Sequence, residues 1–396
     1  MDTISIVGGG IAGLSSAIAL SNLTLNIKIF EKTEYFSKLG AGIQLGPNGT
    51  RAISALGVLD EVVRRSSKPE NIFVYDISTN KHLCKLSLGY EATKKYGYPY
   101  LTILRSDLHS VLKEKVESIA NVEIINNCKI KSLEIQKQKI SILNHFGKEY
   151  HSNALIACDG VHSTIKKLLF KKRKLNHVVS IAYRTLVKNN SKSIKKYSKD
   201  INIWFGKSFH VVTYPVGINQ DINIVVVSSL FSNNKNYGWS NPCQLNDFYF
   251  HFEPFSNVDI SKLIKENNEW FMWPIYESKP VSSNTELCHE SIMFCGDAGH
   301  YMKPHMAQGA SMALEDGVHI MKATEHEKNN KILDWKKLFT YISKKRLKRV
   351  SKVQKISSRN GYIFQATGIV RVARNYVLKL FGKRILNQKW IYKNGS

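Results

Sequence analysis

The sequence predicts an α/β protein in which a parallel sheet is interrupted by an antiparallel sheet and followed by a helical tail. Three observations predict this class. A β-branched strand pattern runs into a glycine-rich turn and then a helix pattern at the start of the chain. Strand-like runs separated by polar stretches dominate residues 171–280. Helical periodicity covers most of residues 311–396.

Length and composition narrow the class further. The 396 residues suit two interlocked domains, and 43% hydrophobic with 22% charged residues is ordinary for a globular protein. No apolar run approaches the ~20 residues that span a bilayer. The strand pattern begins too early to leave room for a signal peptide. Six scattered cysteines without a C-x-x-C pair indicate free thiols in a reducing compartment, so we expect a cytoplasmic enzyme.

The charge of the chain is unusual, because 57 basic and 31 acidic residues give a formal net charge of +26. One interpretation is attraction to nucleic acid, an anionic membrane or an acidic substrate. The other is a compositional bias spread over solvated faces. The lysines occur throughout the chain without a nucleic-acid motif or aromatic interleaving, which favours the bias and predicts no nucleic-acid partner.

The first motif is a G-x-G-x-x-G pattern at Gly8, Gly10 and Gly13, directly after the strand pattern of Thr3–Val7. One glycine permits the tight turn, one lets a pyrophosphate approach the backbone, and one lets the helix pack on the strand. The motif therefore predicts a Rossmann-type dinucleotide site.

The second strand pattern, Leu25–Phe30, ends in Glu31, eighteen residues after Gly13. A carboxylate at this place can accept hydrogen bonds from both hydroxyls of an adenosine ribose. It would repel a 2′-phosphate, so the pattern favours FAD or NAD over NADP.

Two later segments are candidates for contact with the same ligand. The glycine-rich loop Gly40–Asn48, which includes Gly42, suits backbone that passes close to a flat ligand, although a plain surface loop has the same composition. Arg105 stands where a strand pattern becomes a helix pattern. It has the reach to bind a phosphate or, equally, to pair with Asp107 or Glu114 on the surface.

Two further strands end in turns that contain an acid and a glycine. Asp159-Gly160 follows the apolar run 154–158, and Gly296-Asp297 follows the apolar run 291–295. Such a turn before a helix brings a carboxylate and unpaired backbone N–H groups to one polar ligand. Asp297 with His300 and His305 also suggests a metal site. The intervening proline and the lack of a matching fourth ligand argue against it, so we predict no metal.

The order of these patterns predicts a discontinuous first domain. We assign residues 1–70, 98–170 and 281–325 to the dinucleotide-binding domain, and residues 71–97 and 171–280 to an antiparallel sheet domain. Residues 326–396 form a C-terminal helical region.

Together these motifs resemble the single-component FAD-dependent aromatic monooxygenases (group A flavoprotein hydroxylases), and within them the salicylate hydroxylase-like branch. The resemblance runs nearly end to end. Beyond the motifs above, it is carried by Leu104–His109, Tyr183–Arg184, His210–Pro215, Pro304–Asp316 and Trp390–Tyr392. It implies a p-hydroxybenzoate hydroxylase-like fold, with a Rossmann-type FAD-binding domain and an inserted substrate-binding sheet.

The resemblance also implies roles for the motif residues. The three glycines would hold the FAD pyrophosphate and Glu31 the adenosine ribose. Arg105 would reach the phosphate and ribityl region, and Asp297 would bind the ribityl chain. Asp159 and Gly160 would support the pyrophosphate region and the place where NADH or NADPH docks transiently.

The activity that the resemblance implies is hydroxylation of a small phenolic acid. NAD(P)H reduces the flavin, which captures O2 as a C4a-hydroperoxide that attacks a ring activated by an ionised phenol. Our first expectation is salicylate, converted to catechol, by a monomer or homodimer. Alternatives are another hydroxybenzoate or hydroxynicotinate, a ubiquinone-precursor ring reached from an anionic membrane through the basic tail, or a flavoprotein without enzyme activity.

The candidate catalytic residues are His210 and Tyr214. Ionising a phenol requires a base with a pKa near the working pH, which histidine supplies. Four residues apart on one strand, both side chains lie on the same face and can share a pocket. Relatives that hydroxylate hydroxybenzoates place such a pair beside the substrate. Arg184 is a weaker candidate for binding a substrate carboxylate, because its position in the family looks structural.

Overall fold

The computed structural model describes residues 2–35, 41–136, 139–170, 177–189, 192–230, 241–248, 259–265, 267–277, 279–325 and 333–393. A six-stranded sheet contains the N-terminus and has the order β18-β19-β11-β1-β2-β7. Its strands are β18 (Cys288–His289), β19 (Ile292–Phe294), β11 (Ala154–Ala157), β1 (Asp2–Val7), β2 (Leu25–Phe30) and β7 (Val122–Ile125). All neighbours are parallel except β18 and β19.

Helices cover this parallel sheet, as its apolar strands require. Every residue of β11 is buried, a burial pattern typical of strands packed on both faces. The described helices are α1 (Ile11–Leu20), α2 (Pro47–Ala55), α3 (Leu59–Arg64), α4 (Gly89–Tyr96), α5 (Arg105–Glu117), α6 (Thr164–Phe170), α7 (Lys192–Lys195), α8 (Asp259–Lys265), α9 (Asp297–His300), α10 (Gly309–Glu325), α11 (Trp335–Phe364), α12 (Gly368–Leu386) and α13 (Lys389–Tyr392). Helix α1 packs against both α5 and α10.

An eight-stranded sheet forms the second layer, in the order β16-β17-β12-β15-β14-β13-β4-β5. Its strands are β16 (Asn241–Cys243), β17 (Trp270–Tyr276), β12 (Val178–Val187), β15 (Asp221–Ser228), β14 (Phe209–Val216), β13 (Ile201–Phe205), β4 (Asn71–Asp76) and β5 (Lys81–Ser87). Within this sheet, β13–β4 is the only parallel pairing among the described strands. The sheet thus joins strands from residues 71–87 to strands from residues 178–276.

Two small sheets complete the described strands. One contains β8 (Ile130–Gln136), β9 (Lys139–Asn144) and β10 (Glu149–Ser152), and the other pairs β3 (Gly42–Leu45) with β6 (Leu101–Leu104). The prediction of a glycine-rich loop at Gly40–Asn48 is therefore wrong for Gly42–Leu45, because pairing with β6 satisfies the backbone there. Gly40 lies outside the described residues.

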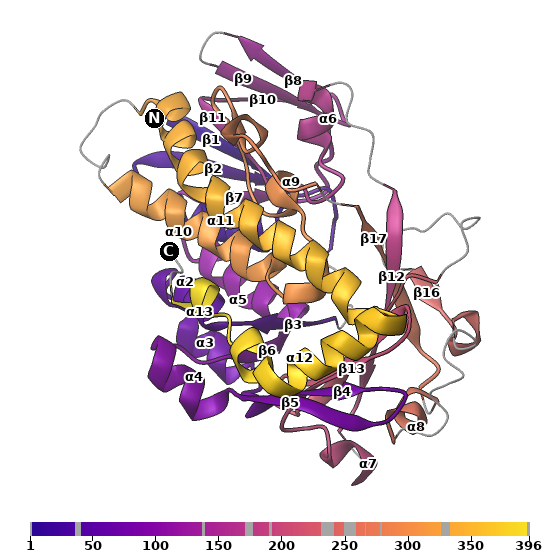
Figure 1. Cartoon of the computed structure of the whole chain (residues 1–396). Helices are drawn as coiled ribbons and strands as arrows, with labels where there is room; N and C mark the ends of the chain where they lie inside the picture. The colour runs from indigo at the N-terminus through magenta and orange to yellow at the C-terminus, as the bar shows by residue number, and fades with distance from the viewer. Residues whose placement is uncertain are drawn as a thin grey trace.

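The C-terminal helices connect the two large sheets. Figure 1 shows α11 crossing in front of both layers and α12 lying over β5. Among the described residues, no helix is long and apolar enough to cross a membrane.

Candidate active site

The carboxyl ends of four adjacent parallel strands bring the predicted residues to one edge of the sheet. Phe30, Val7, Ala157 and Phe294 stand in register across β2, β1, β11 and β19. The residues that follow each strand therefore share one edge: Glu31, the Gly8 turn, Asp159 and the Gly296-Asp297 turn. Ligands of open α/β sheets bind at this edge, where the strand order reverses.

The glycines of the first turn have the geometry that the motif predicts. Gly8 has a φ of +106°, and a Cβ there would lie 2.4 Å from the carbonyl oxygen of Cys158. A Cβ on Gly13 would lie 1.9 Å from the Gly8 carbonyl oxygen, so only glycine lets α1 approach the strand. Gly10, in contrast, faces open space whose nearest atom is a guanidinium nitrogen of Arg105, 4.0 Å away.

Glu31 directly follows β2 and also stabilises this turn. Its Oε2 accepts a hydrogen bond from the Gly9 N–H at 2.8 Å, and its Oε1 accepts from the Thr33 N–H and hydroxyl at 2.9 Å. On the other side of the turn, the Nε2 atom of His109 lies 2.7 Å from the Gly9 carbonyl oxygen. His109 was not among the predicted site residues, because nothing in the sequence distinguishes it from an ordinary helix residue.

Arg105 lies close enough to both Glu31 and Asp297 for their charges to act on it. Burial lowers the pKa of Arg105, while the charges of Asp297 and Glu31 oppose that shift. Its side chain nevertheless remains exposed, as does that of Asp297, whose pKa is raised by burial against the attraction of His300 and Arg105. Both side chains are thus accessible to solvent at an edge where the surrounding protein still disfavours their charged forms.

The surface pairing considered for Arg105 is taken by another residue. The Glu114 carboxylate accepts hydrogen bonds from the Arg65 guanidinium at 2.9 and 3.2 Å. The backbone N–H of Arg105 donates to the Ala41 carbonyl at 2.9 Å, which places Arg105 beside the Gly42 segment.

Asp159 has one oxygen engaged and one without a partner. Its Oδ2 accepts from the N–H groups of Thr164 and Ile165 at 2.6 and 3.1 Å and so caps α6. Its Oδ1 is buried without a hydrogen-bond partner among the described residues. Burial raises the pKa of this carboxyl group.

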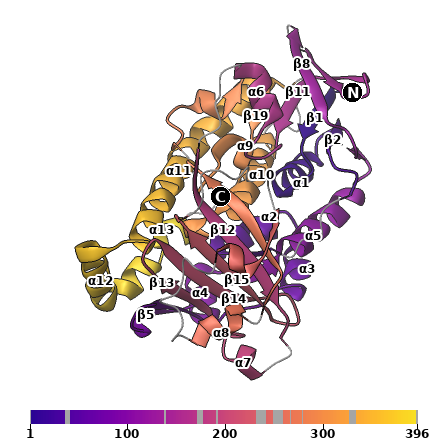
Figure 2. The ribbon, with the colours of Figure 1, turned by 90° about the vertical axis from the view of Figure 1, so that its right-hand side faces the viewer.

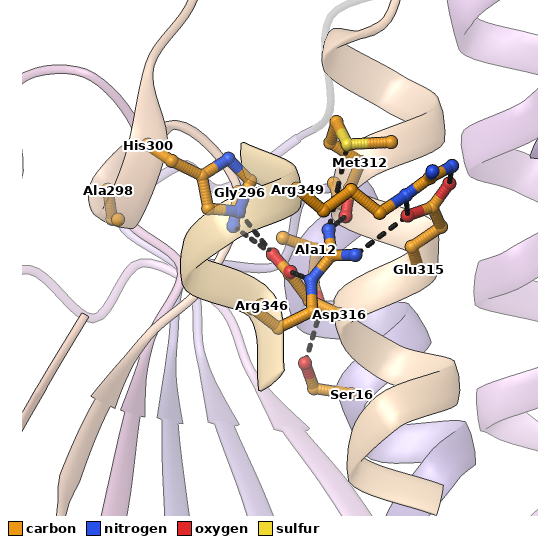
Figure 3. Close-up of polar contacts among 12 residues, drawn as sticks. Ala12, Ser16, Gly296, Ala298, His300, Met312, Glu315, Asp316, Arg346 and Arg349 are labelled. Carbon is orange, nitrogen blue, oxygen red and sulfur yellow. Dashed lines mark hydrogen bonds and ion pairs between the residues drawn. The ribbon is translucent and has the colours of Figure 1, made fainter. Parts of the chain in front are cut away.

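A buried ionic network lies behind the Gly296-Asp297 turn (Figure 3). The Asp316 carboxylate accepts from the Gly296 N–H at 2.9 Å and from Arg346 Nε at 2.8 Å, and it lies 2.6 Å from His300 Nε2. Arg346 also donates to Glu315 at 2.7 Å. Burial opposes the negative charge of Asp316, but His300 and Arg346 hold its pKa well below the ordinary value.

The sequence reasoning missed this network. Arg346 is 1% exposed and belongs to α11, in a lysine-rich stretch that reads as a solvated face. The sequence contains one indication of it. The adjacent acids Glu315 and Asp316 lie in a helix pattern rich in apolar and small residues, and burying such a pair requires cations beside it. His300, which was considered as a metal ligand, instead contacts Asp316 through its Nε2 atom. No group of three metal-ligand side chains occurs among the described residues.

The second predicted cluster lies on β14, in the larger sheet. His210 is 3% exposed and its ring packs against His305 and Phe364, with centroids 5.3 and 5.4 Å away. The Nδ1 atom of His210 and both ring nitrogens of His305 are buried without hydrogen-bond partners among the described residues. Burial, together with His305, lowers the pKa of His210 well below the ordinary value, and burial lowers that of His305 to about 4.

Tyr214 lies on the same strand but contacts a different segment. Its hydroxyl donates to the Gly42 carbonyl at 2.8 Å, and the Gly42 N–H donates to Asn223 Oδ1 at 2.8 Å. The N–H and the carbonyl group of Gly42 are thus both hydrogen-bonded within the protein. With a flat ligand, Gly42 can therefore make only packing contacts. Burial raises the pKa of Tyr214 to about 12, against the nearby charge of Arg184.

The arrangement at the sheet edge fits a dinucleotide that carries a second ring system. The glycine turn and the start of α1, which has no side-chain cap, present backbone N–H groups suited to a pyrophosphate. Arg105 and Asp297 lie at the same edge, and the backbone of Arg105 is bonded to the segment that Tyr214 of β14 contacts. A family model described as an FAD binding domain matches residues 1–329.

The chain belongs to this FAD-binding family. FAD is therefore its cofactor, and the resemblance to the group A flavoprotein hydroxylases is confirmed. Two relatives illustrate the class. The chain is 27% identical over 379 residues to a 3-hydroxybenzoate 6-hydroxylase of Polaromonas naphthalenivorans, covering 95% of this chain and 91% of the relative. It is also 27% identical over 365 residues to a 6-hydroxynicotinate 3-monooxygenase of Bordetella bronchiseptica, covering 91% of each.

Solved structures agree on the fold. A salicylate hydroxylase substrate complex aligns with a TM-score of 0.81 at 21% identity, covering 99% of this chain and 95% of that one. HpxO of Klebsiella pneumoniae, complexed with FAD and uric acid, aligns with a TM-score of 0.84 at 18% identity, covering 98% and 95%. The p-hydroxybenzoate hydroxylase-like fold expected from the motifs is thus confirmed, and the chain is an FAD-dependent aromatic monooxygenase.

Proposed function

We propose that this monooxygenase hydroxylates a small aromatic acid that already carries a ring hydroxyl, with His210 accepting the hydroxyl proton. The observation that carries the proposal is the buried pair of His210 and His305. The Nδ1 atom of His210 and both ring nitrogens of His305 lack hydrogen-bond partners among the described residues. Buried polar groups without partners cost free energy, which a polar ligand that bonds to them recovers. The names of the relatives support a substrate class of hydroxybenzoates and hydroxynicotinates, to which salicylate also belongs.

Without substrate, the pKa of both histidines lies below the value that the expected base requires at the working pH. Burial lowers the pKa of both histidines, so the rings are neutral near pH 7 and can accept a proton. A phenolate or carboxylate placed beside them would raise their pKa again, because a neighbouring negative charge favours the imidazolium. An anionic substrate therefore strengthens the base that ionises its own hydroxyl.

The remaining groups would position the ring between this base and the cofactor. Tyr214 lies at the Gly42 segment, and we assign it to the pocket wall nearest the flavin. Arg184 lies over the Trp273 ring at 5.2 Å, and its Nε is buried without a described partner, so we assign it the substrate carboxylate. The flavin, reduced by NADH or NADPH, supplies the activation of dioxygen.

The test is a substrate screen with purified, FAD-loaded protein. Salicylate, 3-hydroxybenzoate and 6-hydroxynicotinate are compared with benzoate and nicotinate, which lack the ring hydroxyl. We expect at least one hydroxylated acid to stimulate NAD(P)H oxidation and to give a hydroxylated product by mass spectrometry, while the matched controls do not. Failure of every hydroxylated acid, with turnover of a polyprenyl phenol instead, would assign the enzyme to a lipid-like ring.

A further inference from the structure

The positive charge of the chain is concentrated at its C-terminal end. Residues 335–396 contain seventeen lysines and arginines and no aspartate or glutamate. This segment alone supplies more than half of the net charge of +26. A bias spread evenly over the chain would include acidic residues here, so the concentration requires its own explanation.

Helix α12, within this segment, exposes an apolar face. Ile369, Val372, Tyr376 and Leu380 follow one another at helical spacing and are 88%, 69%, 65% and 57% exposed. Val370, Val377, Phe381 and Ile385 extend the same face and are also exposed. So many exposed apolar side chains on one surface helix are typical of an interaction site.

The opposite face of α12 is fixed to the protein, so the apolar face cannot turn inward. Leu378 and Gly382 are buried, and a Cβ on Gly382 would lie 2.3 Å from the Cβ of Cys84 on β5. The Asp76 carboxylate accepts from Arg371 at 2.9 and 3.0 Å. Figure 2 shows the helix at the edge of the molecule, with no other element beyond it.

Exposed cations lie beside and among these apolar side chains, toward the C-terminal end of α12. Lys379, Lys383 and Arg384 are all exposed, and α12 contains no acidic residue. Long basic side chains beside an apolar stripe are typical of helices that lie in a membrane interface, where the stripe enters the headgroup region and the cations meet anionic lipid.

We propose that α12 docks the enzyme peripherally on an anionic membrane surface. A second copy of the chain fits the face less well, because a two-fold contact through α12 would bring the same three cations together without an acidic counterpart. The proposal is independent of which ring is hydroxylated. Phe364, which packs on His210 and His305, is the last residue of α11, so docking would hold the substrate pocket close to the membrane.

The experiment is sedimentation of the full-length, FAD-loaded enzyme with phosphatidylcholine vesicles that contain or lack a quarter phosphatidylglycerol. We expect binding only to the anionic vesicles and a steep loss with added salt. A charge variant replaces Lys379, Lys383 and Arg384 with Gln. It should bind on the order of 100-fold more weakly, at about fivefold per cation. A matched control replaces the exposed Lys115, Lys129 and Lys131, distant in sequence, with Gln and should bind like the wild type.

A second variant, Leu380→Ser with Phe381→Ser, tests the apolar face. It should also lose vesicle binding while keeping its FAD content and unfolding temperature. The control Ile218→Ser, at an exposed apolar residue outside α12, should keep vesicle binding. The proposal is overturned if the wild type ignores anionic vesicles, or if the control lysines matter as much as those of α12. It is equally overturned if the double serine variant instead converts a dimer into a monomer, since the face would then join two copies.

Discussion

Replacing Arg346 with Met is expected to destabilise the protein through the network that supports the Gly296-Asp297 turn. Arg346 is 1% exposed and donates to two buried carboxylates, at 2.7 Å to Glu315 and 2.8 Å to Asp316. Glu315 keeps a second cation, because Arg349 donates to it at 2.6 and 2.7 Å. Asp316 keeps only His300 and one backbone N–H, so most of the cost falls on Asp316.

The size of the effect follows from leaving a buried charge without its partner. Removing one member of a buried ion pair costs about 3–5 kcal/mol, and the methionine restores packing volume but no charge. We therefore expect the free energy of unfolding, measured by urea denaturation of the FAD-loaded enzyme, to fall by about that amount. FAD should also dissociate more readily, because Asp316 holds the Gly296 N–H.

Two further variants make this prediction specific. Lys348→Met changes an exposed residue of the same helix and should leave stability within about 0.5 kcal/mol of the wild type. Adding Asp316→Asn to Arg346→Met removes the unpaired charge while keeping an acceptor for the Gly296 N–H, so it should recover part of the loss. An Arg346→Met enzyme as stable as the Lys348→Met enzyme would refute the account of the network.

Three other predictions concern the glycine turn and the histidine pair. Gly13→Ala should abolish FAD binding, measured by flavin absorbance, because its Cβ would lie 1.9 Å from the Gly8 carbonyl oxygen; normal FAD content would contradict this. His210→Ala should slow hydroxylation by about 100-fold or more while NAD(P)H oxidation continues and releases hydrogen peroxide; coupled turnover at the wild-type rate would remove His210 from the mechanism. The His305 pKa of about 4 in the folded protein lies below that of an unfolded histidine. The unfolded chain therefore binds the proton first, and about 3 kcal/mol of stability should be lost as the pH falls from about 6.5 toward 4. His305→Asn should flatten this part of the unfolding profile, and an unchanged profile would show that His305 does not titrate there.

The parts of the site that are local in sequence could be predicted from the sequence. The glycine turn, Glu31 and the acid–glycine turns are each read from a strand, a turn and a helix start within about twenty residues. Their meeting at one edge depends on the order of the strands in the parallel sheet. The family resemblance implied that the motifs share one site, whereas the strand order that brings them together was not predicted.

Contacts between distant segments could not be predicted in this way. His305 was weighed only as a metal ligand, because its neighbours in sequence are His300 and Pro304, yet in the structure its ring packs on His210 of β14. Arg346 likewise looks like one more surface lysine or arginine. Only the tertiary fold shows that α11 turns it toward Glu315 and Asp316.

The most direct test of the central claim is the fate of dioxygen during turnover with a hydroxylated aromatic acid. The FAD-loaded enzyme is supplied with NAD(P)H, the acid that stimulates oxidation most strongly, and isotopically labelled dioxygen. The account predicts that one labelled oxygen atom enters the aromatic product in the wild type, and that His210→Ala diverts the label into hydrogen peroxide. An unlabelled product, or NAD(P)H oxidation that no hydroxylated acid stimulates, would contradict it.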